Sequence, residues 1–512
     1  MKVDYAQISQ RILDTFGNTM DVVQIPFRCA GLDGGVFFLD GFIDKLLFEN
    51  NILRPVKAMQ SLQPPYGEAI QAATLVTTPL QCVDDEQQAI THIAGGDIVM
   101  LIDGAEQFFV FSEKQYSIRG IQEPPVSTVL RGPREGFVED FKTNLTLLRR
   151  RMATPNLRFE MLTLGKYTGT RVVISWLDGV ADPKIVQQVK DKLQTIDRDG
   201  IIESSYVARY LENHKMSIFS QVGATEKPDI ATAKMLEGRI AIVVDGSPMV
   251  LTVPFVLYES FQASEDYYIK SYRASLIRGI RLIAVMIAIL LPAIYVALQQ
   301  FQYQMFPLKF LITIMNSIYG IPLTPTLEML LVLVIFEILN EASIRMPRYV
   351  GMALSIVGAM VLGETAVNAG LLSTPAILVI AVSTIGLYCV PDESNTSSVL
   401  RFFFVAIAGV LGLLGVLLCS IMLIAYLCTL DSMGTSFLAP FAPAIVHDWQ
   451  DGILKSNVTD MDERPYTIPT NNRKRILNRI LLTRLIKAIR GSFFCWRLSA
   501  RYALRSSCCP NT

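Results

Sequence analysis

Four charged residues stand in segments that are otherwise apolar enough to lie in a membrane. Glu337, Glu341 and Arg345 are spaced four residues apart, which places them on one face of a helix. Glu341 and Arg345 can pair, whereas Glu337 is left unmatched and Glu364 is a second lone carboxylate. Burying an unpaired charge is costly, so these residues are candidates for function. They suit a ring of carboxylates that lines a cation pathway once several copies assemble. The alternative is that they reach the membrane surface or form structural ion pairs.

Other motifs that carry chemistry are absent from the sequence. It contains no phosphate-binding loop, nucleophile elbow or zinc-binding HExxH motif, and its three histidines are far apart. Gly409, Gly412 and Gly415 lie inside a long apolar run, where they cannot form a phosphate loop. The eight cysteines form no CxxC pair, which favours a reduced compartment over a disulfide framework. We therefore expect neither an enzyme nor a cofactor or metal site.

The composition divides the chain into a polar part and an apolar part. Its 512 residues include 46 Lys and Arg against 46 Asp and Glu, a balance that argues against nucleic-acid binding. The hydrophobic fraction is 51% and the mean hydropathy is +0.37, which is more apolar than an ordinary soluble protein. Between Leu282 and Leu430 only ten charged residues occur. The N-terminus has no apolar leader, so we expect a cytoplasmic N-terminal domain fused to a membrane domain.

The polar part repeats itself. Four short apolar runs end in Asp-Gly, and Asp40 and Asp103 in the first half correspond to Asp178 and Asp245 in the second, about 140 residues later. Apolar runs that end in such pairs are typical of buried strands followed by turns. We therefore expect one α/β unit used twice, with the aspartates serving turn geometry rather than binding a ligand.

An arginine-rich stretch, 122–160, joins the two copies. Within it, the segment 137–152 has the spacing of a helix. One interpretation is a solvated linker helix held by salt bridges, and the other is an interaction surface for another subunit or an anionic partner. The candidate residues for that surface are Arg131, Arg134, Arg149, Arg150 and Arg151.

Four segments of the apolar part read as membrane spans, 282–298, 350–372, 375–390 and 402–430, and the acidic stretch 327–344 is ambiguous. Basic residues before the first span and in an amphipathic tail, 473–505, favour both ends on the inner side. If both ends lie on the same side, the number of membrane crossings must be even, which favours four crossings with 327–344 re-entrant. Five crossings is the alternative. A stripe of small residues predicts close helix packing and comprises Gly351, Ser355, Ala359 and Gly363.

Several motifs together resemble a known family. The runs RGPREGF and NLTLLRRR, the repeated strand–Asp-Gly units, and the later LLPAIYVAL and FEILNEASIRMP resemble the A subunit of GerA-type spore germinant receptors over about 36–443. The resemblance implies a subunit of a nutrient receptor in the spore inner membrane, acting with a transporter-like B subunit and a lipoprotein C subunit. It also implies homo-oligomers that form a ligand-gated channel for monovalent cations.

Two alternatives to the channel remain, a secondary transporter and a non-conducting scaffold or sensor. The fold class we expect is a duplicated α/β soluble domain followed by an α-helical polytopic membrane domain with four or five spans. We expect an N-terminal helical segment over 1–30, a first α/β subdomain over 31–120, the arginine-rich linker region over 121–165 and a second α/β subdomain over 166–270. A transmembrane domain over 271–445 and a basic cytoplasmic tail over 446–512, which contacts lipid, complete the chain.

Overall fold

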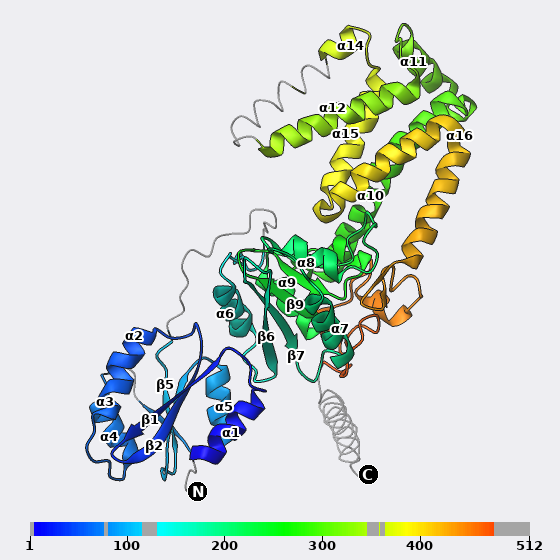
Figure 1. Cartoon of the computed structure of the whole chain (residues 1–512). Coiled ribbons are helices and arrows are strands. Elements are labelled where there is room, and N and C mark those ends of the chain that lie inside the picture. Colours follow the sequence, from blue (N-terminus) through cyan, green and yellow to red (C-terminus); the bar gives the residue numbers. More distant parts are fainter. Residues whose placement is uncertain (1–4, 76–79, 115–130, 346–357, 359–363, 476–512) are drawn as a thin grey trace, which may run out of the picture.

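The computed structural model describes residues 5–75, 80–114, 131–345, 358 and 364–475. In Figure 1 two α/β units follow one another along the chain, and a bundle of helices rises from the second unit. After the bundle the chain returns to the second unit, where Ala181 forms a β-bridge with Thr470. The second unit thus holds both the entry to the bundle and the exit from it.

The first unit is a five-stranded antiparallel sheet with helices on both faces. Its strands are β1 (Val22–Cys29), β2 (Leu32–Leu39), β3 (Gln81–Val83), β4 (Ile98–Ile102) and β5 (Phe108–Phe111), in the order β1-β2-β4-β5-β3. Successive side chains of a strand point to opposite faces, so each face has its own core. One core contains α1 (Tyr5–Thr15) and α5 (Glu86–Ala94). The other contains α2 (Lys45–Phe48), η1 (Glu49–Leu53), α3 (Arg54–Lys57) and α4 (Tyr66–Ala73).

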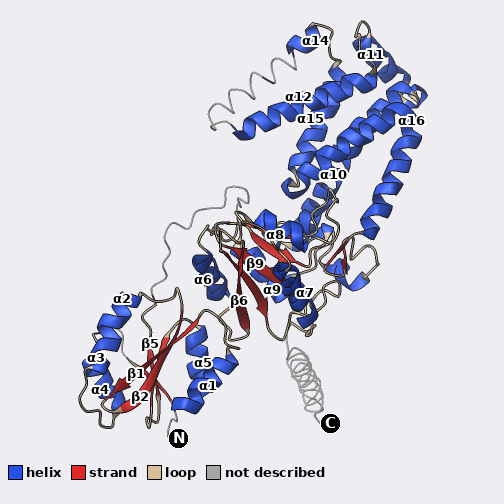
Figure 2. Cartoon of the chain, in the orientation of Figure 1, coloured by secondary structure: helices blue, strands red, loops and turns tan. Residues whose placement is uncertain are grey.

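The second unit has the same topology. Its strands are β6 (Leu157–Leu164), β7 (Thr170–Leu177), β8 (Gly223–Thr225), β9 (Ile240–Val244) and β10 (Val250–Val253), in the order β6-β7-β9-β10-β8. Helices α6 (Phe141–Arg151) and α9 (Pro228–Leu236) cover one face, and α7 (Pro183–Gln194) and α8 (Ser204–Leu211) cover the other (Figure 2). The predicted duplication is confirmed, and the helix expected in the linker, α6, occupies the position in the second unit that α1 occupies in the first.

The Asp-Gly pairs act as turns. The glycines that follow β2, β4, β7 and β9 are Gly41, Gly104, Gly179 and Gly246, with φ between 75° and 85°. This left-handed region is open to glycine and disfavoured for other residues, which explains why the Asp-Gly pair recurs.

Elsewhere in the second unit, the Glu203 side chain caps the N-terminus of α8. Burial raises the pKa of its carboxyl, but hydrogen bonds from serines, including Ser205 and Ser247, outweigh burial and lower this pKa to about 2.

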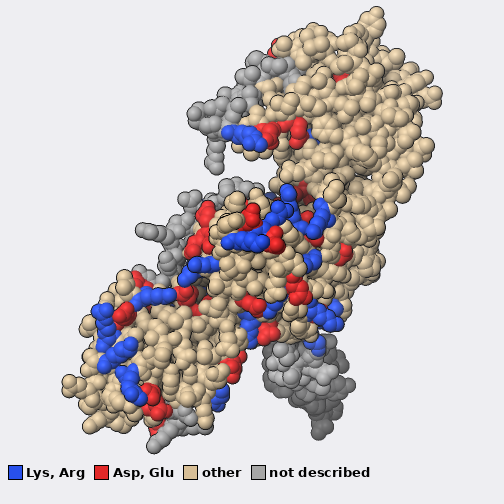
Figure 3. Space-filling view, viewed as in Figure 1, with Lys and Arg blue, Asp and Glu red and all other residues tan. Residues whose placement is uncertain are grey.

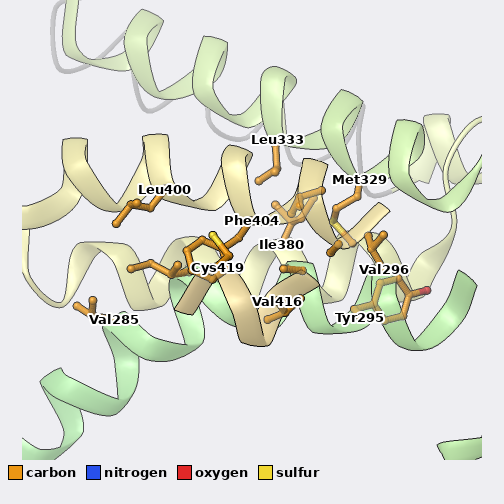
Figure 4. Packing of buried hydrophobic residues seen from close by; sticks show 14 of the residues in the cluster. Val285, Tyr295, Val296, Met329, Leu333, Ile380, Leu400, Phe404, Val416 and Cys419 are labelled. Carbon is orange, nitrogen blue, oxygen red and sulfur yellow. The ribbon is translucent and has the colours of Figure 1, made fainter. Parts of the chain in front are cut away.

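The helical bundle contains α10 (Ser271–Gln300), α11 (Leu308–Ile318), α12 (Pro325–Arg345), α14 (Ala366–Asn368), α15 (Thr374–Tyr388) and α16 (Ser394–Thr429). Its core is one apolar cluster drawn from α10, α12, α15 and α16 (Figure 4). Charged side chains cover the two α/β units in Figure 3, whereas the visible surface of the bundle is nearly free of them except at one end of α12. This distribution agrees with membrane association.

The predicted number of crossings is not confirmed. Among the described residues, two helices are long and apolar enough to span a membrane, 271–300 and 391–429. Helix α15, expected as a span over 375–390, has only 15 residues and is shorter than a bilayer core requires. The expected span 350–372 falls mostly outside the described residues, and so does most of the basic tail.

The segment 402–430 was expected as one span, and in the structure it belongs to α16, which has two arms. Gly412, in its middle, has φ 63° and ψ −148°, which breaks the helix. Near the start of α16 the Thr396 hydroxyl donates to the Ile218 carbonyl at 3.1 Å, and just after its end the Ser432 hydroxyl donates to the Gln221 carbonyl at 2.7 Å. Both ends therefore contact the second α/β unit, so α16 is a hairpin. Each arm is about 25 Å long at 1.5 Å per residue.

Candidate functional site

Helix α12 packs one side against the bundle, and none of the described residues covers its other side. From Leu327 to Ile338 the exposed side chains are separated alternately by four and three residues, the repeat of a helix that packs along another helix. The apolar members, Leu327, Leu331, Val334 and Ile338, are between 42% and 61% exposed. The same spacing continues to Glu341 and Arg345. The uncovered face therefore ends in the predicted charged pair.

Glu337 is not unmatched, contrary to the prediction. Its carboxylate lies 3.7 Å from the guanidinium of Arg401 on α16 and accepts a hydrogen bond from the Ser398 hydroxyl at 2.8 Å. Arg401 is 1% exposed, and its guanidinium also donates to the Ser383 and Thr384 hydroxyls at 3.2 and 3.3 Å. The Glu337 side chain is 43% exposed, so this ion pair is half-buried. In the described part of the chain it ties α12 to α16, and the hydrogen bonds of Arg401 add α15.

The other predicted carboxylates lie apart from that ion pair. Glu341 and Arg345 pair as predicted, with a nitrogen–oxygen distance of 2.5 Å, but their side chains are 59% and 77% exposed. Glu364 is exposed and lies two residues before α14, which lies at the opposite end of the bundle from the Arg345 end of α12 (Figure 1). The structure therefore pairs Glu341 with Arg345 at the exposed end of α12, apart from the ion pair of Glu337, and leaves Glu364 at a distance from both.

Sequence reasoning missed three partners at this end of the bundle. Arg401 and Ser398 lie more than 60 residues beyond Glu337, and Tyr388 donates from its hydroxyl to the Asn340 side chain at 2.9 Å. One signal was present in the sequence: Arg401 is the lone cation in its apolar run. A buried cation of that kind needs a carboxylate.

The predicted interaction surface is partly internal. Arg149 is 1% exposed and binds Asp21, with a shortest distance of 2.8 Å, so it links the first α/β unit to the second. Arg150 and Arg151 both pair with Glu135, the latter at 2.9 Å. The remaining two candidates, Arg131 and Arg134, have exposed side chains.

A buried charge network joins the second unit to the base of α10. The Arg278 guanidinium, 1% exposed, lies 3.0 Å from Asp266 and 2.9 Å from Asp451, and Arg281 lies 2.8 Å from Asp266. Tyr267 donates to Asp451 at 2.8 Å. Segments before and after the bundle are thus bound to the same helix turn.

Two predictions receive no structural outcome. The small-residue stripe, Gly351, Ser355, Ala359 and Gly363, lies outside the described residues. For metals, the described residues contain no group of three or more His, Cys, Asp or Glu side chains arranged to hold an ion.

The fold and this ion-paired bundle define a membrane-associated protein that carries a duplicated α/β domain. A family model described as Bacillus/Clostridium GerA spore germination protein matches residues 10–467, and the chain belongs to this family. The resemblance inferred from the sequence motifs is confirmed. The family consists of germination proteins, not enzymes, in agreement with the expectation from the motifs.

Curated relatives cover most of the chain. Spore germination protein KA of Bacillus subtilis (strain 168) is 33% identical over 467 residues, which are 90% of this chain and 86% of that protein. Spore germination protein GerLA of Bacillus cereus is 31% identical over 475 residues, 91% of this chain and 96% of that protein. Among solved structures, the N-terminal domain of the A subunit of the Bacillus megaterium spore germinant receptor GerK3 covers 48% of this chain and 92% of its own, with 27% identity and a TM-score of 0.39.

Proposed function

We propose that this chain is the A subunit of a nutrient germinant receptor in the spore inner membrane and that several copies assemble into a ligand-gated pathway for monovalent cations. It acts with a transporter-like B subunit, which binds the nutrient, and a lipoprotein C subunit. The α/β units lie in the cytoplasm. Nutrient binding on the partner shifts the bundle from a closed to an open arrangement.

The uncovered face of α12 is the single observation that carries this proposal. One chain cannot enclose a pore with so few helices, so a pathway needs several copies. The face from Leu327 to Ile338 has the repeat that lets helices pack side by side, and it leads to the exposed carboxylate of Glu341. In an assembly these carboxylates form a ring that attracts cations.

Disulfide cross-linking tests the assembly. We expect Ile338→Cys, in a background with the native cysteines replaced by serine, to form dimers between chains in native membranes under mild oxidation. Leu414→Cys on α16 is the matched control, because Leu414 is 62% exposed and Ile338 is 61% exposed. Cross-linking that is absent at position 338, or equal at both positions, would contradict assembly through α12.

Ion release tests the role of the carboxylates. Glu341→Gln and Glu364→Gln remove exposed charges and leave the internal ion pairs of the bundle intact, except for the surface pair of Glu341 with Arg345. We expect Glu341→Gln to slow nutrient-triggered potassium release from spores at unchanged receptor abundance. Unchanged kinetics in both variants would remove these carboxylates from the pathway.

Two alternatives each have one observation in their favour. A non-conducting scaffold is favoured by the pairing of Glu337 with Arg401, which makes that carboxylate structural. A secondary transporter is favoured by the break at Gly412, because transporters bind substrates at broken helices. Potassium efflux from liposomes separates a channel from a scaffold, and substrate exchange without potassium flux would indicate a transporter.

A further inference from the structure

A second polar cluster is buried at the end of the bundle opposite Glu341. Its centre is Glu328, in the first turn of α12, which is 1% exposed although it carries a carboxylate. The ion pairs of the described residues include none to Glu328. A carboxylate this deeply buried requires a proton, a bound cation or strong hydrogen-bond donors.

Hydrogen-bond donors and helix ends surround the Glu328 carboxylate. The backbone N–H of Ser373 donates to the carboxylate at 2.5 Å, and Ser373 is the N-cap residue of α15. Glu328 itself lies in the first turn of α12. The N-termini of two helices, each with a partial positive charge, therefore stabilise a negative charge at this point.

Unpartnered polar atoms on α10 face the same region. Among the described residues the Tyr295 hydroxyl makes no hydrogen bond of ordinary length, although its side chain is only 7% exposed. The Glu328 carboxylate and the Ser373 hydroxyl are close enough to interact with it. Figure 4 shows the Tyr295 hydroxyl at the Met329 end of the apolar cluster. Gln299, one turn further along the same face of α10, has both amide atoms buried and unpartnered. Buried polar atoms are normally satisfied, so these point to an occupant.

We propose that Glu328 and Tyr295 bind a dehydrated monovalent cation, sodium or potassium, with the Gln299 amide oxygen as a further ligand. Carboxylate, hydroxyl and amide oxygens are ligands that hard cations prefer. One carboxylate and one monovalent cation make a neutral pair, whereas a divalent ion would leave a net charge in an apolar bundle. The cation holds α10, α12 and α15 together. The site goes beyond the proposed pathway, because it stabilises a single chain whether or not that chain conducts.

Thermal unfolding of the purified full-length protein in a neutral detergent tests the site. We compare sodium chloride, potassium chloride and choline chloride at equal concentration. A ligand that binds only the folded state stabilises it, so sodium or potassium should raise the melting temperature by about 2–4 °C over choline. The rise should disappear in Glu328→Gln and in Tyr295→Phe. It should persist in Glu68→Gln, which removes an exposed carboxylate from α4 in the first α/β unit.

Three results would overturn the proposal: no cation-specific rise in the wild-type protein, an undiminished rise in Tyr295→Phe, or stabilisation that depends on falling pH instead of on sodium or potassium. The last would mean that Glu328 holds a proton. Should Glu328→Gln fail to fold, Tyr295→Phe decides the matter, because it removes one ligand and preserves the ring that fills the site. The cation-dependent melting temperature does not report on contacts between chains through α12. The proposed assembly is therefore tested separately, by the disulfide cross-linking experiment.

Discussion

Replacing Gly412 by alanine would strain the bend that makes α16 a hairpin. At φ 63° and ψ −148° the backbone is in a region that only glycine enters readily, at a cost of about 1–3 kcal/mol for other residues. The new Cβ would also lie 3.0 Å from Cδ2 of Phe301 and 3.2 Å from Nε2 of Gln302. Such overpacking costs about 1–3 kcal/mol more. We therefore expect a loss of stability of roughly 2–6 kcal/mol.

The assay is unfolding of the purified full-length protein in detergent, measured by loss of helical circular dichroism during a denaturant titration. Gly279→Ala is the matched control, because Gly279 lies inside α10 and a Cβ there would meet no atom within 4 Å. That variant should be neutral or more stable by up to about 1 kcal/mol, since alanine favours helix. If Gly412→Ala were as stable as the wild-type protein, α16 would be a continuous helix and the hairpin would be wrong.

Three further outcomes follow from charged side chains that the structure pairs or hydrogen-bonds. Glu337→Gln should lower the free energy of unfolding by about 1–3 kcal/mol, because Arg401 is buried whereas Glu337 is half-exposed. A Glu337→Leu, Arg401→Met double variant should recover much of that loss in the same denaturant titration. Asp266→Asn should cost about 3–5 kcal/mol, because Arg278 loses a fully buried partner; a change below the error of the titration would show that Asp451 alone suffices. The lowered pKa of Glu203 stabilises the fold above the unfolded value of about 4.3, and this stability is lost as the pH falls towards 2. The loss should be smaller in Glu203→Gln, as checked by melting temperatures across that pH range.

The duplicated domain could be predicted from the sequence because its signals are local. A strand that ends in Asp-Gly needs a glycine with positive φ, so Gly41 and Gly179 mark equivalent turns in the two units. The antiparallel pairing was not predictable from those runs alone, since a short buried strand looks the same in either kind of sheet. The role of α6 was also hidden, because its arginines suggested a solvated helix while Arg149 is buried against Asp21.

The candidate site was predicted only in part. The pairing of Glu341 with Arg345 follows from helical spacing within four residues. The pairing of Glu337 with Arg401 depends on how α12 meets α16, which no local pattern determines. The hairpin was missed for a related reason: in the sequence Gly412 is one of three glycines in a long apolar run, and its backbone angles are not known from that pattern.

Potassium efflux from liposomes tests the central claim most directly. The full-length chain is reconstituted with its B and C partners into potassium-loaded vesicles, and efflux is followed after a mixture of amino acids and sugars is added. We predict nutrient-dependent efflux that is slower with Glu341→Gln than with the wild-type chain at equal protein content. Vesicles that remain sealed to potassium while the nutrient binds the partner subunit would contradict the claim that this chain forms the pathway.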